Sequence, residues 1–328
     1  MTDGGAPRLR RATIVGAGRM GVGIAENFLI GGLSVRFTDA DPEQTQAAKE
    51  RLVERMRGHA AAGLIGEDSA ALAATAVPEE SISAAVEDAD LIIEAVTEDI
   101  DVKREVLGAC DASASSTAII ASNTSSLAIN ELARFVNRPE RFLGMHWFNP
   151  PEWTPGVEVI PVAQTEPAVV AEVFELLTAI GKRPSIVSAS TGFVANRLQM
   201  ALFCEAARCV EEGLASPREI DEVVRSCFGF RLPYFGPFQI ADMAGLDVYQ
   251  AVLRQHEQAF GERFKVPDRV DELVGHGQRG TASGSGFYDY GEAASDGLLV
   301  ERDRRYAALS QLLHDHPPLD FNGGGKTS

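Results

Sequence analysis

The feature that most constrains the fold is a group of three glycines near the start of the chain. Gly16, Gly18 and Gly21 form G-x-G-x-x-G in "ATIVGAGRMGVGIAENF", after a strand-like apolar segment and at the start of a helix-like one. The first glycine allows a tight turn, the second lets a ligand approach the backbone, and the third lets helix and strand pack closely. The pattern predicts a cradle for the phosphates of a dinucleotide, because a helix N-terminus offers N–H groups and the positive end of its dipole.

The next predicted strand indicates which dinucleotide binds. "SVRFTD" ends at Asp39, and a carboxylate there accepts hydrogen bonds from ribose hydroxyls and repels a 2′-phosphate. We therefore expect NAD as the cofactor, with Met20 of the glycine motif in the same site. Two alternatives stay open: the glycines form only turns while Asp39 caps a helix, or Arg36 favours NADP.

The rest of the first half predicts an α/β fold. Between Arg11 and about Val187, short apolar segments alternate with amphipathic ones. The strand candidates are "ATIVG", "SVRFTD", "DLIIEAV", "TAIIASN", "RFLGMHW", "VEVIPV" and "RPSIVSA". Strands alternating with helices are typical of a parallel, doubly wound sheet of the Rossmann type.

After Thr191 the sequence predicts only helices. "GFVANRLQMALFCEAARCVEEG" indicates one long apolar helix ending at Gly213, of the kind buried in a domain core or a subunit interface. "SPRE", which begins at Ser216, is a capping box for the next helix. A chain of 328 residues exceeds the usual size of a single core. We expect a Rossmann domain at 1–190 and an all-α domain at 191–328, ending in a disordered "NGGGKTS".

The composition excludes several classes of function. With 30 Lys and Arg against 47 Asp and Glu, the net charge of -17 argues against nucleic-acid binding. Four cysteines without paired C-x-x-C spacing are typical of a reduced, cytoplasmic protein. The N-terminal "MTDGGAPRLRR" has no apolar signal region, and no apolar run is long enough to span a membrane. We expect neither membrane association nor a metal site.

One histidine is the main candidate for a catalytic base. His146 ends the predicted strand "RFLGMHW" at the carboxyl edge of the sheet, where open α/β sheets bind ligands. A histidine with a carboxylate on its second nitrogen has a fixed tautomer and suits general base catalysis. Glu158 fits that role if the proline-rich segment after His146 returns as an adjacent strand. From these residues alone, a structural histidine beside an unrelated acid is an equal alternative.

Other polar residues fall at the same predicted edge. "SNTSSL", residues 122–127, ends the preceding strand in hydroxyls and an amide, which suit a substrate oxygen better than a core. Asn196 and Arg197 interrupt an otherwise apolar helix, and buried polar groups need partners. Both features favour a catalytic role for His146.

Several co-linear motifs resemble one enzyme family. They are "GAGRMG", "EAVTEDIDVK", "ASNTSSL", "GMHWFNP", "TGFVANR", "FGPFQIADMAGLDV" and "GSGFYDY". Over roughly residues 10–290 the chain resembles the L-3-hydroxyacyl-CoA dehydrogenase family, which includes 3-hydroxybutyryl-CoA dehydrogenases and relatives acting on smaller hydroxy acids.

The resemblance implies a role for each matching polar residue. His146 would remove the hydroxyl proton, and Glu158 would orient it. The other implied site residues are Ser125 and Asn196 at the substrate and in catalysis, Asn149 at the substrate, and Glu98, Lys103 and Asn123 at the cofactor. A structural hydrogen bond is the alternative for these residues. The helical half resembles the family's dimerisation domain, which implies a homodimer.

The sequence departs from the acyl-CoA members between His146 and Glu158. Those members usually continue "HFFNPVPVM", whereas this chain has "HWFNPPEWTPG", similar to relatives that oxidise carnitine, gulonate or pyridine-alcohol acids. Trp147 and Trp153 are expected to narrow the pocket toward short or compact substrates.

A basic segment bears on whether the substrate carries CoA. In the acyl-CoA members, basic residues after the second strand hold the CoA phosphates. The matching residues here are Lys49, Arg51, Arg55, Arg57 and His59. We expect Arg55 and Arg57 to contact a phosphorylated carrier, with a solvated helix face as the alternative.

Three functions follow from these patterns. The first is an NAD-dependent dehydrogenase that interconverts a 3-hydroxyacyl thioester, such as a short-chain 3-hydroxyacyl-CoA of fatty acid metabolism, and its 3-keto form. The second is the same chemistry on a free hydroxy acid or aromatic alcohol. The third is a non-catalytic NAD-binding protein, which the set of Ser125, His146, Glu158 and Asn196 argues against.

Overall fold

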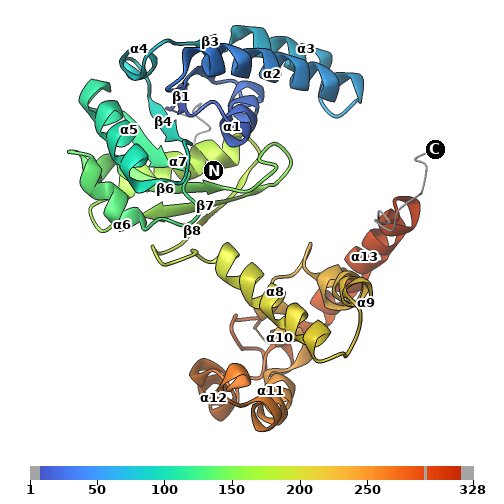
Figure 1. Cartoon of the computed structure of the whole chain (residues 1–328). Helices are drawn as coiled ribbons and strands as arrows, with labels where there is room; N and C mark the ends of the chain where they lie inside the picture. The colour runs from blue at the N-terminus through green and yellow to red at the C-terminus, as the bar shows by residue number, and fades with distance from the viewer. Residues whose placement is uncertain (1–7, 292–293, 319–328) are drawn as a thin grey trace. The chain divides into compact units, whose positions relative to one another are not determined.

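The computed structural model describes residues 8–291 and 294–318, which form two compact units (Figure 1). The first unit ends at Phe203 and the second begins at Cys204, inside a single helix. The predicted disordered tail "NGGGKTS" lies outside the described residues. Within the described ranges, no helix is both long enough and apolar enough to cross a membrane.

The first unit is built on an eight-stranded sheet with the order β3-β2-β1-β4-β5-β6-β7-β8. The strands are β1 (Arg11–Val15), β2 (Ser34–Thr38), β3 (Val77–Pro78), β4 (Leu91–Glu94), β5 (Ile119–Ser122), β6 (Phe142–Trp147), β7 (Gly156–Pro161) and β8 (Arg183–Ile186). All neighbours are parallel except β6 and β7, which are antiparallel. All seven strand candidates form strands, and only the two-residue β3 was missed.

Helices cover both faces of this sheet. They are α1 (Arg19–Ile30), α2 (Pro42–Ala61), α3 (Glu67–Ala71), α4 (Ile82–Val86), α5 (Ile100–Ser113), α6 (Ile129–Leu132) and α7 (Pro167–Ala179), with 3-10 turns η1 (Leu72–Thr75), η2 (Ala133–Phe135) and η3 (Pro139–Arg141). One apolar core joins Ile14 of β1 to α1, α2 and α7, and a second joins Val15 to α5 and α6. Adjacent residues of β1 enter different cores because side chains alternate along a strand.

The strand order fixes where a ligand can bind. β1 and β4 are neighbours, but α1 packs in one core and α5 in the other. The chain therefore leaves these two strands toward opposite faces, which opens a crevice at their carboxyl ends.

The second unit is helical, as predicted. It contains the end of α8 (Ala195–Glu211), then α9 (Pro217–Val223), α10 (Pro237–Ala244), α11 (Leu246–Phe260), α12 (Asp268–Gly275) and α13 (Ala294–Asp315), with short turns η4 (Val224–Phe228), η5 (Gly229–Arg231), η6 (Gly261–Phe264) and η7 (Thr281–Ser283). The predicted capping box forms between Ser216 and Glu219. Asp242, which is 1% exposed, accepts hydrogen bonds from Phe287 N, Tyr288 N and the Tyr290 hydroxyl. These bonds join the "FGPFQIADMAGLDV" and "GSGFYDY" motifs.

The long apolar helix differs from its prediction in two ways. α8 begins at Ala195 rather than Gly192, because Gly192 and Phe193 adopt positive φ angles of 72° and 48° and form a turn. None of its residues is buried, and Leu198 and Phe203 are 58% and 64% exposed. Burial in a core of the same chain is therefore wrong for this helix, and burial in a subunit interface stays a prediction.

Candidate active site

The glycine loop has the shape that a dinucleotide requires. Gly16 has a φ of 113°, and a Cβ there would collide with the backbone of Ala95. A Cβ on Gly21 would collide with the carbonyl oxygen of Gly16, whereas one on Gly18 would meet nothing within 4 Å. Packing therefore requires the first and third glycines, and the second leaves backbone open to a ligand. Gly18 is also the N-cap of α1, and no side chain of the described residues caps this helix. The backbone N–H groups at the start of α1 can therefore donate hydrogen bonds to a phosphate.

Asp39 lies against this loop. Its carboxylate accepts a hydrogen bond from Ala17 N at 2.8 Å, and Arg51 donates to Ala17 O at 2.9 Å. Asp41, not Asp39, is the N-cap of α2, so the helix-capping alternative is wrong. Arg36 forms ion pairs with Glu79 and Asp88 instead of facing the cradle as a free cation. The Asp39 carboxylate thus lies at the position where such a group would accept hydrogen bonds from the ribose hydroxyls of a dinucleotide.

His146 and Glu158 form a buried pair across two antiparallel strands. They face each other in the β6–β7 register, and His146 Nδ1 lies 2.9 Å from Glu158 Oε2. The side chains are only 3% and 7% exposed. An ionised carboxylate only accepts hydrogen bonds, so a neutral imidazole in this position holds its proton on Nδ1 and keeps the lone pair of Nε2.

The rest of the Glu158 carboxylate is also occupied. Its Oε1 atom accepts hydrogen bonds from Val194 N at 3.0 Å and Ala195 N at 2.9 Å, at the first turn of α8. Glu158 therefore caps α8 with one oxygen and orients His146 with the other. Nε2 of His146 has no partner within the described ranges and is free to accept a proton.

The predicted polar residues after β5 and on α8 contact neighbours of this pair and one another. Asn123 Oδ1 accepts from Trp147 N at 2.9 Å, which ties the end of β5 to β6. Asn196 Nδ2 donates to Ser125 O at 3.2 Å. The Ser125 hydroxyl has no hydrogen-bond partner in the part of the chain that the structure describes. The arrangement leaves a free hydroxyl and a free imidazole nitrogen for a substrate oxygen.

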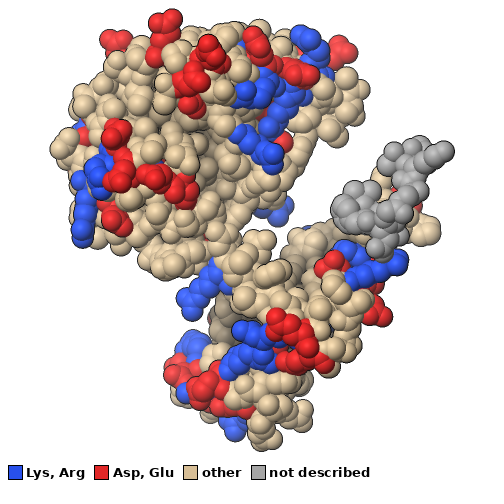
Figure 2. Space-filling view, in the orientation of Figure 1, with Lys and Arg blue, Asp and Glu red and all other residues tan. Residues whose placement is uncertain are grey.

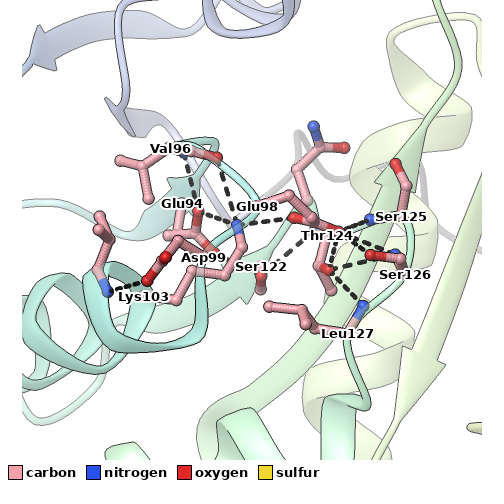
Figure 3. A network of polar contacts seen from close by, with 12 residues as sticks. Glu94, Val96, Glu98, Asp99, Lys103, Ser122, Thr124, Ser125, Ser126 and Leu127 are labelled. Carbon is pink, nitrogen blue, oxygen red and sulfur yellow. Dashed lines mark hydrogen bonds and ion pairs between the residues drawn. The ribbon is translucent and has the colours of Figure 1, made fainter.

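Glu98 organises the loop that carries Ser125 (Figure 3). Its Oε1 atom accepts from the Thr124 hydroxyl, from Ser125 N at 2.7 Å and from Ser126 N at 2.8 Å. Burial alone would raise the pKa of Glu98, but the Thr124 hydrogen bond and the charge of Lys103 lower it to about 2. Glu98 is therefore an anion at neutral pH.

Lys103 lies beneath this loop, only 1% exposed. Its ammonium contacts Glu94 Oε1 at 2.6 Å, Glu98 Oε2 at 3.3 Å and Val96 O at 3.4 Å. Glu94 is a site residue that the sequence patterns did not indicate. A carboxylate at the end of the apolar strand "LIIE" was the available signal, because a buried charge must find a partner.

The two arginines expected at a carrier differ in their surroundings. Lys and Arg side chains gather among acidic ones over α2 (Figure 2). Arg55 forms ion pairs with Glu26 and Glu152, so these two carboxylates already neutralise the charge of its guanidinium group. Arg57 is exposed, with no partner in the described chain, and Asn149 is also exposed.

The role expected for Trp147 is wrong. Trp147 is 2% exposed and packs edge-on against Phe28, on the face of β6 opposite to His146. Trp153 packs against His59, at 5.0 Å between ring centroids. The rings that flank His146 are Phe148 and Phe193, at 4.4 Å and 5.3 Å.

Comparisons with known proteins identify the family of the chain. The 3-hydroxyacyl-CoA dehydrogenase NAD binding domain matches residues 11–190, and the C-terminal domain of the same family matches residues 192–290.

Three similar proteins cover nearly the whole chain. A 5-formyl-3-hydroxy-2-methylpyridine 4-carboxylate 5-dehydrogenase from Mesorhizobium japonicum is 35% identical over 93% of this chain and 98% of its own. A probable 3-hydroxybutyryl-CoA dehydrogenase from Bacillus subtilis is 34% identical over 88% and 99%. The crystal structure of an (S)-3-hydroxybutyryl-CoA dehydrogenase from Ralstonia eutropha is 36% identical, covers 87% and 100%, and has a TM-score of 0.64. With its glycine cradle and Rossmann sheet, the chain belongs to the 3-hydroxyacyl-CoA dehydrogenase family and is an NAD-dependent oxidoreductase.

Proposed function

We propose that the protein interconverts a short-chain 3-hydroxyacyl thioester, such as 3-hydroxybutyryl-CoA, and its 3-keto form. The observation that carries the proposal is the buried His146–Glu158 pair at the carboxyl edge of the sheet, in which Nε2 has no partner among the described residues. The names of the relatives from Bacillus subtilis and Ralstonia eutropha support this substrate class. Gly16, Gly18, Gly21 and Asp39, beside Met20, would hold NAD, which would accept the hydride from the substrate carbon.

In this proposal each polar residue acts on the hydroxyl or on its surroundings. His146 Nε2 takes the hydroxyl proton, and the anionic Glu158 stabilises the resulting imidazolium. The Ser125 hydroxyl donates to the substrate oxygen, while Asn196 holds Ser125 by its carbonyl. Asn149, exposed on the loop after β6, contacts the rest of the substrate, and Arg57 contacts the carrier phosphates. Glu98, Lys103 and Asn123 shape the cofactor side of the site.

A second candidate is the same chemistry on a free aromatic or hydroxy acid. One observation favours it: Glu152, in the segment that differs from the acyl-CoA members, already neutralises Arg55. The relative from Mesorhizobium japonicum is named for a pyridine carboxylate. Under this candidate Arg57 is a solvated surface residue.

We also propose a cytoplasmic homodimer that works in fatty acid metabolism. The dimer is supported by the exposed apolar side chains of α8, which a second copy can cover. The Rossmann domain is proposed to span residues 1–190 and the dimerisation domain residues 191–328.

A substrate panel tests the proposed function. Purified protein is assayed by NADH absorbance with acetoacetyl-CoA, longer 3-ketoacyl-CoAs, and free 3-hydroxy and pyridine acids, with His146→Ala as the inactive control. Turnover of acetoacetyl-CoA above all others supports the thioester reading. Turnover of a free acid alone overturns it in favour of the second candidate, and preference for long-chain thioesters overturns the short-chain assignment.

A further inference from the structure

A fully buried carboxylate lies at the centre of the polar network behind the site. Glu94 is the last residue of β4 and is 0% exposed. Its Oε1 atom accepts from Lys103 Nζ at 2.6 Å and from Val96 N at 2.9 Å, and its Oε2 atom accepts from the Ser122 hydroxyl at 2.5 Å (Figure 3). One side chain thus joins the ends of β4 and β5 to the first turn of α5.

The contacts of Glu94 extend to both loops at this edge of the sheet. Lys103, held by Glu94, pairs in turn with Glu98 and donates to Val96 O within the β4–α5 loop. Glu98 then binds Ser125 N and Ser126 N of the loop after β5. Because a buried ammonium and carboxylate are each costly without the other, the position of Lys103 depends on Glu94.

The position of these loops relates them to the cofactor. Gly16 of the phosphate cradle packs directly against the backbone of Ala95 and Val96, which immediately follow Glu94. Asp39, at the end of β2, marks the adenosine side of the crevice. A dinucleotide that crosses the ends of β1 and β4 must then carry its nicotinamide half over the β4 and β5 loops toward His146 on β6.

We propose that Glu94 is a positioning residue for the nicotinamide half of NAD, acting through Lys103 and Ser122 on the two loops that lie under it. This inference rests on the proposed use of the crevice in the proposed function. Glu94 has no hydrogen bond to His146 in the described chain, so its effect falls on cofactor binding more than on proton removal.

Glu94→Gln is the main variant for the test. Glutamine keeps the size and an acceptor oxygen but removes the charge, so Lys103 retains only Glu98 as a charged partner and is drawn away from Val96 O. We expect the Kd for NADH, measured by fluorescence titration, to rise about 10- to 100-fold, the effect of losing one charge-assisted hydrogen bond. The KM for NAD should rise in parallel, with a smaller change in kcat.

A double-mutant cycle tests whether Glu94 acts through Lys103. Lys103→Met should weaken NADH binding on its own, and adding Glu94→Gln should then have little further effect, because the pair is already broken. Ser122→Ala removes the second contact of Glu94, together with the long hydrogen bond from Thr124 N at 3.4 Å, and should weaken NADH binding less than Glu94→Gln. These two variants keep the test decisive if Glu94→Gln alone does not fold.

Asp111→Asn is the matched control. Asp111 is also a buried carboxylate on α5, paired with Arg138 at 2.9 Å, but it lies at the end of the helix away from Glu94. The control should lower Tm and leave NADH binding unchanged. A Glu94→Gln protein with a lowered Tm and an unchanged Kd for NADH would overturn the proposal, as would full additivity with Lys103→Met.

The readout separates this inference from the proposed substrate. NADH titration needs no substrate, so a failure of all thioesters to turn over overturns the proposed function alone. If the natural protein reduces acetoacetyl-CoA but Glu94→Gln leaves the Kd for NADH unchanged, only the proposed role of Glu94 is overturned.

Discussion

At the scale of residues, one carboxylate has two tasks at the reacting centre. Glu158 orients His146 with Oε2 and caps the first turn of α8 with Oε1. The imidazole is therefore held by a group that is itself fixed by two backbone N–H groups. This arrangement limits the rotation of His146 and keeps Nε2 aimed away from β7.

The first prediction concerns the base itself. His146→Ala removes the only group proposed to accept the hydroxyl proton, so kcat should fall about 100- to 10,000-fold. Binding of NADH, followed by fluorescence, should be unchanged, because His146 lies on β6 and not at the glycine cradle. Retained turnover would remove His146 from the mechanism.

Glu158→Gln tests the orientation of the base. The Gln amide can donate to Nδ1, which would then be the acceptor and leave the proton on Nε2, where it blocks general base catalysis. We expect kcat to fall about 100-fold or more with NADH binding retained. An active Glu158→Gln enzyme would show that the tautomer of His146 is not set by this contact.

Sequence patterns identified residues whose chemistry is tied to local spacing. The three glycines and Asp39 follow a fixed strand–turn–helix spacing, and the structure places them together at one crevice. Trp147 was misplaced because it was read as a neighbour of His146, although adjacent strand residues face opposite sides. Glu94 was missed because its partners, Lys103 and Ser122, come together only in the folded sheet.

At the scale of elements, the loop after β5 depends on a single anion. Glu98 accepts hydrogen bonds from two backbone N–H groups of this loop, and its pKa is lowered from 4.5 to about 2. A carboxylate whose pKa is lower in the folded state stabilises that state fully at pH values above its pKa in the unfolded chain. This contribution is lost as the pH falls through its pKa in the folded state.

The prediction for Glu98 follows from this sign. The free energy of unfolding, measured by urea titration, should be lower in Glu98→Gln than in the natural protein near neutral pH. The gap should narrow as pH falls from about 4.5 toward about 2, because Glu98 takes up a proton in that window. A gap that does not change with pH would mean that the charge of Glu98 does not stabilise the loop.

In the second unit, one buried acid holds two motifs together. Asp242 of α10 accepts three hydrogen bonds from the 287–290 segment. Asp242→Ala should lower the free energy of unfolding of this unit by about 2–4 kcal/mol, since it strands buried donors. Tyr290→Phe, the milder control, removes one bond and should cost about 1 kcal/mol. Thermal unfolding followed by calorimetry measures both variants. An equal loss of stability in Asp242→Ala and Tyr290→Phe would contradict this account.

Element existence was more predictable than element ends. The alternation of short apolar and amphipathic segments indicated every strand of four to six residues, whereas β3 has only two residues and no pattern to detect. α8 starts at Ala195 rather than Gly192 because Gly192 and Phe193 form a turn, and Glu158, distant in sequence, caps the helix directly after that turn. Tertiary contacts of this kind are not contained in a local pattern.

At the scale of the whole molecule, α8 carries an apolar surface that one chain does not bury. Leu198, Met200, Leu202 and Phe203 are 42% to 64% exposed, although they belong to a continuous helix. Exposed apolar side chains gathered on one helix favour association, and two copies of this helix can cover each other by two-fold symmetry.

The dimer prediction can be tested on this surface directly. We expect light scattering to give twice the mass of one chain for the natural protein. Leu198→Glu with Phe203→Glu places two charges in the proposed interface and should give a monomer, because an unpaired buried carboxylate is costly. Leu64→Glu, which changes an equally exposed leucine in the turn after α2, is the control and should leave the dimer intact. A dimer that survives the α8 double substitution would place the interface elsewhere, and the exposed face of α8 would then need a different occupant.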